Sequence, residues 1–187
     1  MKIIKTLILN GSPRAKGDGK YIIEKLQGQL NGSVHVIDVY KEEFSPCIDC
    51  RYCWTNCKCS INDDMTKLYE SIDTFDNIVI SSPVYFSELS GPLLSYTSRF
   101  QRHYAEKYLM KDHTFEMKVK KGAVILTAGG DCRSIQRPID TAEIILSHIN
   151  TKIVGTISTM NTNVITPAND ISLRSQIKTV SKLLNMK

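Results

Sequence analysis

The stretch IIKTLILNGSPR, residues 3–14, decides the fold. Its apolar, mostly branched run ends at Asn10 and Gly11. A short apolar run closed by turn residues predicts a β-strand that is buried on both faces. Such strands are typical of parallel sheets that helices cover on both sides, so the first strand already favours an α/β fold.

Predicted helices and strands alternate along the rest of the chain. Apolar residues at helical spacing predict helices at 22–30, 65–72, 93–104, 135–149 and 177–184, and Asp63 or Asp64 can cap the second of these. Apolar runs predict further strands at 34–39, 75–81, 122–127 and 153–157. Five strands that alternate with five helices predict a doubly wound, five-stranded parallel sheet with helices on both faces.

Length and composition limit the class of protein. The 187 residues, with 42% hydrophobic and 23% charged residues, predict a single globular domain over 1–187. No apolar run approaches the roughly 20 residues that span a bilayer, and the first apolar run is too short for a signal peptide. We therefore expect a cytoplasmic protein with no membrane partner. A net charge of +5 permits anionic ligands without requiring a nucleic acid.

Ligands of open α/β sheets bind beyond the carboxyl ends of the strands. The loop after the first strand, residues 11–20, leads directly into a helix and holds three glycines with Ser12, Arg14 and Lys20. Close backbone approach, a hydroxyl, positive charge and a helix N-terminus together suit a phosphate group. The loop matches neither GxGxxG nor GxxxxGK[ST], and an exposed turn with solvated charges is the alternative.

Two further loops lie at the same predicted edge. After the third strand, Tyr85 and Phe86 stand on a tight loop between Pro83 and Pro92, where they can pack on a flat conjugated ring or, alternatively, on the core or a second subunit. After the fourth strand, residues 127–131 offer bare glycine backbone to a polar ring edge, although glycines also occur in ordinary turns.

Five of the six cysteines crowd into residues 47–59, where a disulfide framework would spread them through the chain. Four of them have the spacing CxxCxxCxxxxxC: Cys47, Cys50, Cys53 and Cys59. Closely spaced thiolates gather iron-sulfur clusters, but four thiolates also suit zinc, and redox-active free thiols are a third interpretation. Cys57 is an extra thiol, and the isolated Cys132 is expected to be a buried small side chain.

These motifs together resemble the flavodoxin-like NAD(P)H-dependent FMN reductases. The resemblance rests on residues 11–14, on the stretch from Pro46 to Trp54, on Cys59 followed by residues 62–65, and on residues 82–86. Within that family, the cysteine block is similar to that of the iron-sulfur flavoproteins. The resemblance extends motif by motif from residue 3 to about residue 130, and it implies a flavodoxin-like fold.

The resemblance implies FMN at the carboxyl edge of the sheet. Three groups of residues would bind it: Ser12, Arg14, Gly17, Asp18, Gly19 and Lys20 at the phosphate; Pro83, Val84, Tyr85, Phe86 and Ser87 at the isoalloxazine; and Thr127, Gly129 and Gly130 at its far edge. Relatives commonly have Gly-Asn-Thr where this chain has residues 17–19. Asp18 beside a phosphate dianion and the missing hydroxyl lower the expected affinity, which Lys20 would restore.

The implied activity is electron transfer from NAD(P)H, as cosubstrate, through FMN to a quinone, a flavin or another small acceptor. No catalytic side chain is expected, because the cofactor carries the chemistry. The alternative is an electron carrier with FMN and a 4Fe-4S cluster on the four cysteines, exchanging electrons with ferredoxin-like partners. A non-catalytic flavin or zinc module is a third hypothesis. The tyrosine-rich segment 103–121 is where relatives form dimers, so we expect a homodimer or homotetramer.

Overall fold

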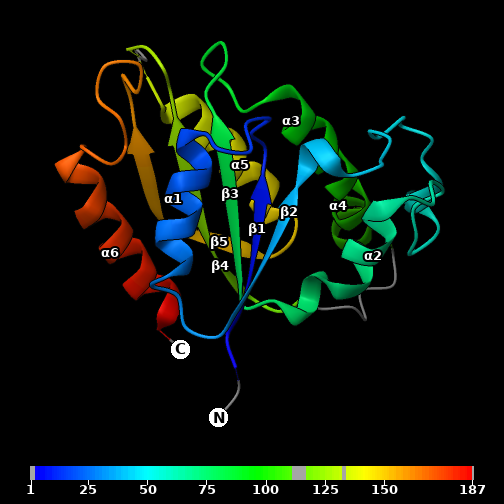
Figure 1. Cartoon of the computed structure of the whole chain (residues 1–187). Helices are drawn as coiled ribbons and strands as arrows, with labels where there is room; N and C mark the ends of the chain where they lie inside the picture. Colours follow the sequence, from blue (N-terminus) through cyan, green and yellow to red (C-terminus); the bar gives the residue numbers. More distant parts are fainter. Residues whose placement is uncertain (1–2, 111–116, 132–133, 187) are drawn as a thin grey trace.

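The computed structural model describes residues 3–110, 117–131 and 134–186, and its centre is a five-stranded sheet (Figure 1). The strands are β1 (Lys5–Asn10), β2 (Ser33–Asp38), β3 (Asn77–Pro83), β4 (Lys120–Thr127) and β5 (Thr151–Thr159). They lie in the order β2-β1-β3-β4-β5, and every neighbouring pair is parallel. This order is that of flavodoxin-like folds, so the predicted doubly wound sheet is confirmed.

Helices cover both faces of the sheet (Figure 1). One face carries α1 (Asp18–Gln27) and α6 (Ile171–Asn185), and the other carries α2 (Asp64–Ser71), α3 (Gly91–Thr97) and α5 (Gln136–Ser147). Helix α4 (Gln101–Tyr108) continues the chain after α3. The helix predicted at 93–104 is divided, because a short 3-10 helix at Ser98–Phe100 separates α3 from α4. In the described ranges, no helix has the length and apolar character that crossing a bilayer requires.

The central strands divide the core between the two faces. Leu7 and Leu9 of β1 pack toward α2, α3 and α5, whereas Ile8 between them packs toward α1 and α6. This follows from the period of two along a strand, which sends neighbouring side chains to opposite faces. All three side chains are fully buried, as predicted, but Ile3 at the start of the predicted run is 66% exposed and lies before β1.

The start of α2 closes the segment that holds the clustered cysteines. Asp63 is its N-cap, and its Oδ1 accepts a hydrogen bond from the Met65 amide at 3.1 Å. Thr66 returns the interaction, because its Oγ1 accepts the Asp63 amide at 3.4 Å. Reciprocal bonds of this kind satisfy two amides that a helix start leaves unpaired. Of the two residues predicted as the cap, Asp63 is therefore the correct one.

Gly32 lies in the turn between α1 and β2, where both the backbone conformation and the lack of space require a glycine. Its φ is +88°, and a Cβ there would lie 2.0 Å from the carbonyl oxygen of Ile4. We predict that Gly32→Ala lowers the free energy of unfolding by more than about 2 kcal/mol, measured by urea denaturation. Gly91→Ala is the matched control, because nothing lies within 4 Å of its added Cβ. A loss no larger than that of the control would contradict the strain at Gly32.

Candidate functional site

The loops that follow β1, β3 and β4 meet at one edge of the sheet, because these strands are neighbours (Figure 1). The amide of Gly11 donates to the carbonyl of Ser81 at 2.8 Å, and the hydroxyl of Ser90 donates to the carbonyl of Gly11 at 2.7 Å. The amide of Val84 donates to the carbonyl of Thr127 at 2.8 Å. The structure thus brings together all three groups of residues predicted to bind the flavin.

The first loop ends at an N-terminus of α1 that has no side-chain cap. Gly17 occupies the N-cap position and offers no side chain to the amides of the first turn. Beneath them, the buried Ser81 hydroxyl has no hydrogen-bond partner, and it lies 3.5 Å from where a Cβ of Gly19 would be. Arg14 is exposed beside them. Free amides, the positive end of the helix dipole and a guanidinium fit a phosphate group.

Lys20 is not an isolated positive charge at this edge. It interacts with Asp38 at the end of β2, whose carboxylate also accepts hydrogen bonds from Asn10 at 2.8 Å and Lys41 at 3.0 Å. Partial burial alone would raise the pKa of Asp38, but these hydrogen bonds and the charges of Lys41 and Lys20 lower it. The charge of Lys20 is therefore shared between the phosphate loop and Asp38.

The loop after β3 forms a tight two-residue turn. Tyr85 and Glu88 exchange both backbone hydrogen bonds at 3.0 Å, and Phe86 and Ser87 between them have φ of 55° and 61°. Positive φ at both central residues defines a type I′ turn. Glu88 anchors the turn to α5, because its carboxylate accepts the hydroxyl of Thr141 at 3.0 Å.

The turn holds its two aromatic residues outward. The exposed fraction is 43% for Tyr85 and 101% for Phe86, so the alternative that Phe86 packs in the core of this chain is wrong. A fully exposed ring on an anchored turn is free to pack on a flat ligand or on another molecule.

The two glycines of the loop after β4 differ in how accessible they are to a ligand. Gly130 is exposed, whereas Gly129 is half-buried and a Cβ on it would lie 2.9 Å from the side-chain amide of Asn163. The Asn163 amide nitrogen in the backbone also donates to the Gly129 carbonyl at 3.1 Å. Asn163, after β5, is therefore a neighbour of the predicted flavin edge that the sequence did not reveal, because nothing in its local pattern marks it.

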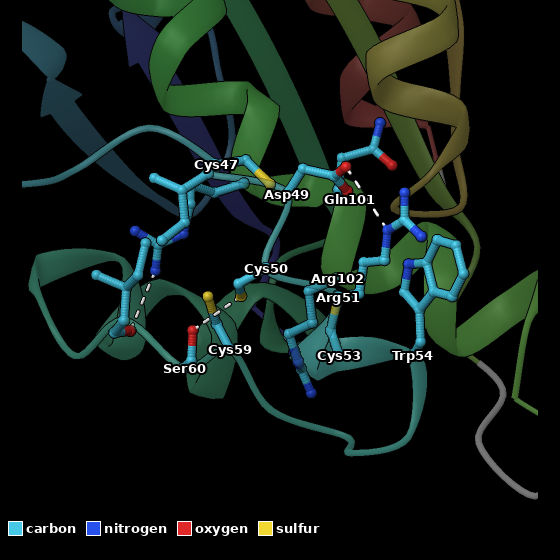
Figure 2. A pocket seen from close by; sticks show the side chains of 13 residues that line it. Cys47, Asp49, Cys50, Arg51, Cys53, Trp54, Cys59, Ser60, Gln101 and Arg102 are labelled. Carbon is cyan, nitrogen blue, oxygen red and sulfur yellow. Dashed lines mark hydrogen bonds and ion pairs between the residues drawn. The ribbon is translucent and has the colours of Figure 1, made fainter.

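The four spaced cysteines line one pocket of about 360 Å³, which Figure 2 shows together with Ser60, Arg51 and Trp54. Cys57 does not line this pocket, and its thiol contacts the sulfur of Met110 at 3.8 Å instead. All five cysteines of this group are free thiols. The fold thus separates the extra thiol, Cys57, from the four cysteines whose spacing predicted a common site. The sixth cysteine, Cys132, was predicted to be buried, but it lies outside the described residues.

The backbone turns sharply on both sides of Cys50. Asp49 and Arg51 have φ of 49° and 59°, in the left-handed region. The thiol of Cys50 lies 3.1 Å from the hydroxyl of Ser60, and that hydrogen bond is the main cause of a lowered pKa at Cys50 (Figure 2). Burial is the main cause of a raised pKa at Cys53, and the other three thiols of the pocket raise it further.

The arrangement of these thiols bears on the kind of metal group they suit. Within 3–110, 117–131 and 134–186, no three His, Cys, Asp or Glu side chains are arranged to hold a single metal ion. Zinc needs four sulfurs within about 2.3 Å of one point. A 4Fe-4S cluster has a different iron for each thiolate, so its ligands can stand farther apart around a larger space. Four thiols are a donor set for either group, and their shared pocket is compatible with a cluster that Cys47, Cys50, Cys53 and Cys59 would hold.

Three residues before and within α4 hold the cysteine loop, which we define as residues 44–62. The hydroxyl of Ser98 accepts the Cys47 amide at 3.0 Å, and Arg102 donates to the Cys57 carbonyl at 2.8 Å. Arg99 is 2% exposed and pairs with Asp63 at 2.7 Å. Sequence reasoning missed all three residues. Ser98 and Arg102 bind backbone groups far away in the sequence. Arg99 stands beside the apolar face of a predicted helix without any signal that it is buried.

The fold and the edge geometry define a flavodoxin-like α/β protein with a phosphate-compatible loop. A family model described as NADPH-dependent FMN reductase matches residues 4–164. The chain therefore belongs to this family, and the resemblance inferred from the motifs is confirmed.

Two curated relatives of the chain are named iron-sulfur flavoproteins. An iron-sulfur flavoprotein of Methanocaldococcus jannaschii is 31% identical over 93 residues, which are 48% of each chain. An iron-sulfur flavoprotein of Methanosarcina thermophila is 26% identical over 124 residues, 65% of this chain and 61% of that one. The chain thus spans about half to three fifths of the length of these curated relatives.

Solved structures share the fold at low identity. An NAD(P)H:quinone oxidoreductase from Methanothermobacter marburgensis superposes with a TM-score of 0.69 at 14% identity, over 98% of this chain and 96% of that one. An FMN-dependent NADH-azoreductase of Bacillus anthracis in complex with FMN has a TM-score of 0.60 at 16% identity, over 96% and 97% of the two chains.

The type I′ turn yields a stability prediction. Glycine adopts the left-handed conformation without the cost that Ser87 incurs, so Ser87→Gly should raise the free energy of unfolding by about 0.5–1 kcal/mol, measured by urea denaturation. Ser95→Gly in the middle of α3 is the control, and it should lower stability, because glycine weakens a helix interior. A loss of stability in Ser87→Gly would show that this turn is not the one described.

Proposed function

We propose that this protein is an FMN-dependent oxidoreductase that takes electrons from NAD(P)H. The observation that carries the proposal is the uncapped N-terminus of α1 at the carboxyl edge of the sheet, with Arg14 and Lys20 beside it. A phosphate dianion there would gain backbone hydrogen bonds, the helix dipole, the charge of Arg14 and part of the charge of Lys20, which together outweigh the charge of Asp18. Membership in the FMN reductase family supports the same proposal.

Three loops would each bind a different part of the cofactor. Ser12 and Arg14 orient the phosphate over the amides that follow Gly17, and Tyr85 and Phe86 supply an apolar wall for the ring system. The exposed backbone of Gly130 is available to the polar edge of the ring. Bound FMN would supply the exchange of a hydride with the nicotinamide and the passage of electrons onward.

The acceptor we propose is a small, flat molecule such as a quinone or a free flavin. The open, anchored turn at 85–88 gives such a molecule an aromatic surface beside the cofactor. We further propose that the protein works as a homodimer or homotetramer, because a fully exposed Phe86 is costly unless a ligand or a second subunit covers it. Free thiols in the cysteine loop are consistent with a cytoplasmic location.

FMN binding tests the proposal directly. We expect one FMN per chain, and Arg14→Ala should weaken FMN binding about 10- to 100-fold, because a charged hydrogen bond to the phosphate is lost. Fluorescence titration of FMN measures this. Lys25→Ala, at the opposite end of α1, is the control and should bind FMN as the unaltered protein does. A protein that takes up no FMN, or an Arg14→Ala variant with unchanged affinity, would contradict the assigned phosphate site.

A second candidate function is electron transfer through FMN and a 4Fe-4S cluster, with a ferredoxin-like partner. Its support is the pocket that four thiols share while the fifth points elsewhere. Iron-sulfur flavoproteins among the relatives support it as well. The ligands we propose are Cys47, Cys50, Cys53 and Cys59, and a bound cluster would supply one-electron exchange.

Anaerobic purification followed by iron and acid-labile sulfide analysis tests the cluster. We predict about four iron and four sulfide per chain in the unaltered protein. Cys50→Ser should lose most of both, because one thiolate ligand is gone, whereas Cys57→Ser should retain them. Absence of sulfide from the unaltered protein would reject the second function and leave the first. Equal losses in both variants would contradict the ligand set.

A further inference from the structure

We propose that Arg99 is the positioning residue of the cysteine pocket: it holds the cysteine loop closed without iron, and its fixed charge sets the reduction potential of the group bound there. The second half rests on the second function above, because a potential exists only if the pocket holds a redox-active iron-sulfur group. The first half concerns the protein alone.

The guanidinium of Arg99 joins the two ends of the cysteine loop. Its Nη1 donates to the carbonyl of Ser45 at 2.8 Å, and its Nη2 donates to the carbonyl of Ile61 at 3.2 Å. Ser45 precedes and Ile61 follows all four proposed ligands. A planar fork with several fixed donors can bridge two such carbonyls, whereas a lysine ammonium cannot reproduce that geometry.

The partner of Arg99 ties this closure to the start of α2. Asp63 accepts Nη1 at 2.7 Å and Nη2 at 3.3 Å, and it also accepts the amide of Ser45 at 3.0 Å. The same carboxylate caps α2. The ion pair is nearly removed from solvent, with exposed side-chain fractions of 1% for Arg99 and 11% for Asp63, so salt does little to screen it.

These contacts do not require a metal. Every acceptor of the Arg99 guanidinium is a backbone carbonyl or the Asp63 carboxylate, and none is a thiol. Ser98 and Arg102 add bonds to the backbone of Cys47 and Cys57. Small metal sites often fold only when the metal binds. Here the bonds that hold the ends of the cysteine loop are all between protein groups.

The charge of Arg99 lies beside the thiols, close enough to interact with Cys59. Arg99 lines the pocket together with the four cysteines, and its Nε is buried without a hydrogen-bond partner. Four thiolates around a cluster form an anionic group, and reduction adds one more negative charge. A buried cation nearby favours the reduced form and raises the potential, and Asp63 offsets part of this effect.

Hydrogen exchange of the full-length, iron-free protein tests the closure. We expect amides of 44–63 to exchange at least about tenfold faster in Arg99→Met and Arg99→Lys, because both lose the bridging fork. The control is Arg51→Gln, since Arg51 lines the same pocket with a side chain that is 63% exposed. It should exchange as the unaltered protein does, and unchanged exchange in both Arg99 variants would overturn the closure.

The potential of the iron-loaded protein separates charge from structure. Arg99→Lys should keep a potential near that of the unaltered protein, whereas Arg99→Met should become more negative. Asp63→Asn retains a capping side chain but removes the offsetting charge, so its potential should become more positive; it also serves if Arg99→Met fails to fold. Equal potentials in all variants would overturn the electrostatic role. A protein without iron and sulfide would reject the second function, while the exchange measurement would still decide the closure.

Discussion

The parallel pairing of β1 between β2 and β3 is the constraint on which the rest of the structure depends. Because strand order reverses there, the connections from β1 and β3 leave toward opposite faces of the sheet, and the loops at their carboxyl ends can part to admit a ligand. The bonds from Gly11 to Ser81 and from Ser90 to Gly11 fix those loops against each other. The phosphate-compatible turn and the aromatic turn are therefore placed by the strands that they follow, and hydrogen bonds between the loops and to α5 fix them there.

The cysteine pocket depends on a different device. It lies in the segment between β2 and α2, beside α4, and no strand of the described part of the chain lines it. A buried ion pair, Arg99 with Asp63, takes that role and brings the loop ends together. Breaking a buried pair of this kind is costly, because one charge is left uncompensated. The two candidate sites thus rest on separate supports, and one can change without the other.

Much of the fold could be predicted because its signals are local. The apolar runs of β1 and β3 and the helical spacing in α1 and α6 each follow from a few neighbouring residues. The break at Ser98–Phe100 could not be predicted, since the apolar spacing continues through it. Arg99, Ser98 and Asn163 were missed because each acts on residues far away in the sequence.

The sequence could not predict whether Phe86 is buried or exposed, since burial depends on the whole fold. The four cysteines illustrate the opposite case. Their spacing predicted one shared site, and the geometry gathers them while it turns Cys57 toward Met110. Spacing could not distinguish a cluster from zinc, because that choice depends on how closely the sulfurs converge.

The central claim is that the N-terminus of α1 holds the phosphate of a flavin. Comparing the affinities of FMN and riboflavin for the unaltered protein tests it most directly, because the two ligands differ only in that phosphate. We predict that FMN binds at least about 100-fold more tightly, since a dianion gains several charged hydrogen bonds at the helix N-terminus. Equal affinities for the two ligands would contradict it.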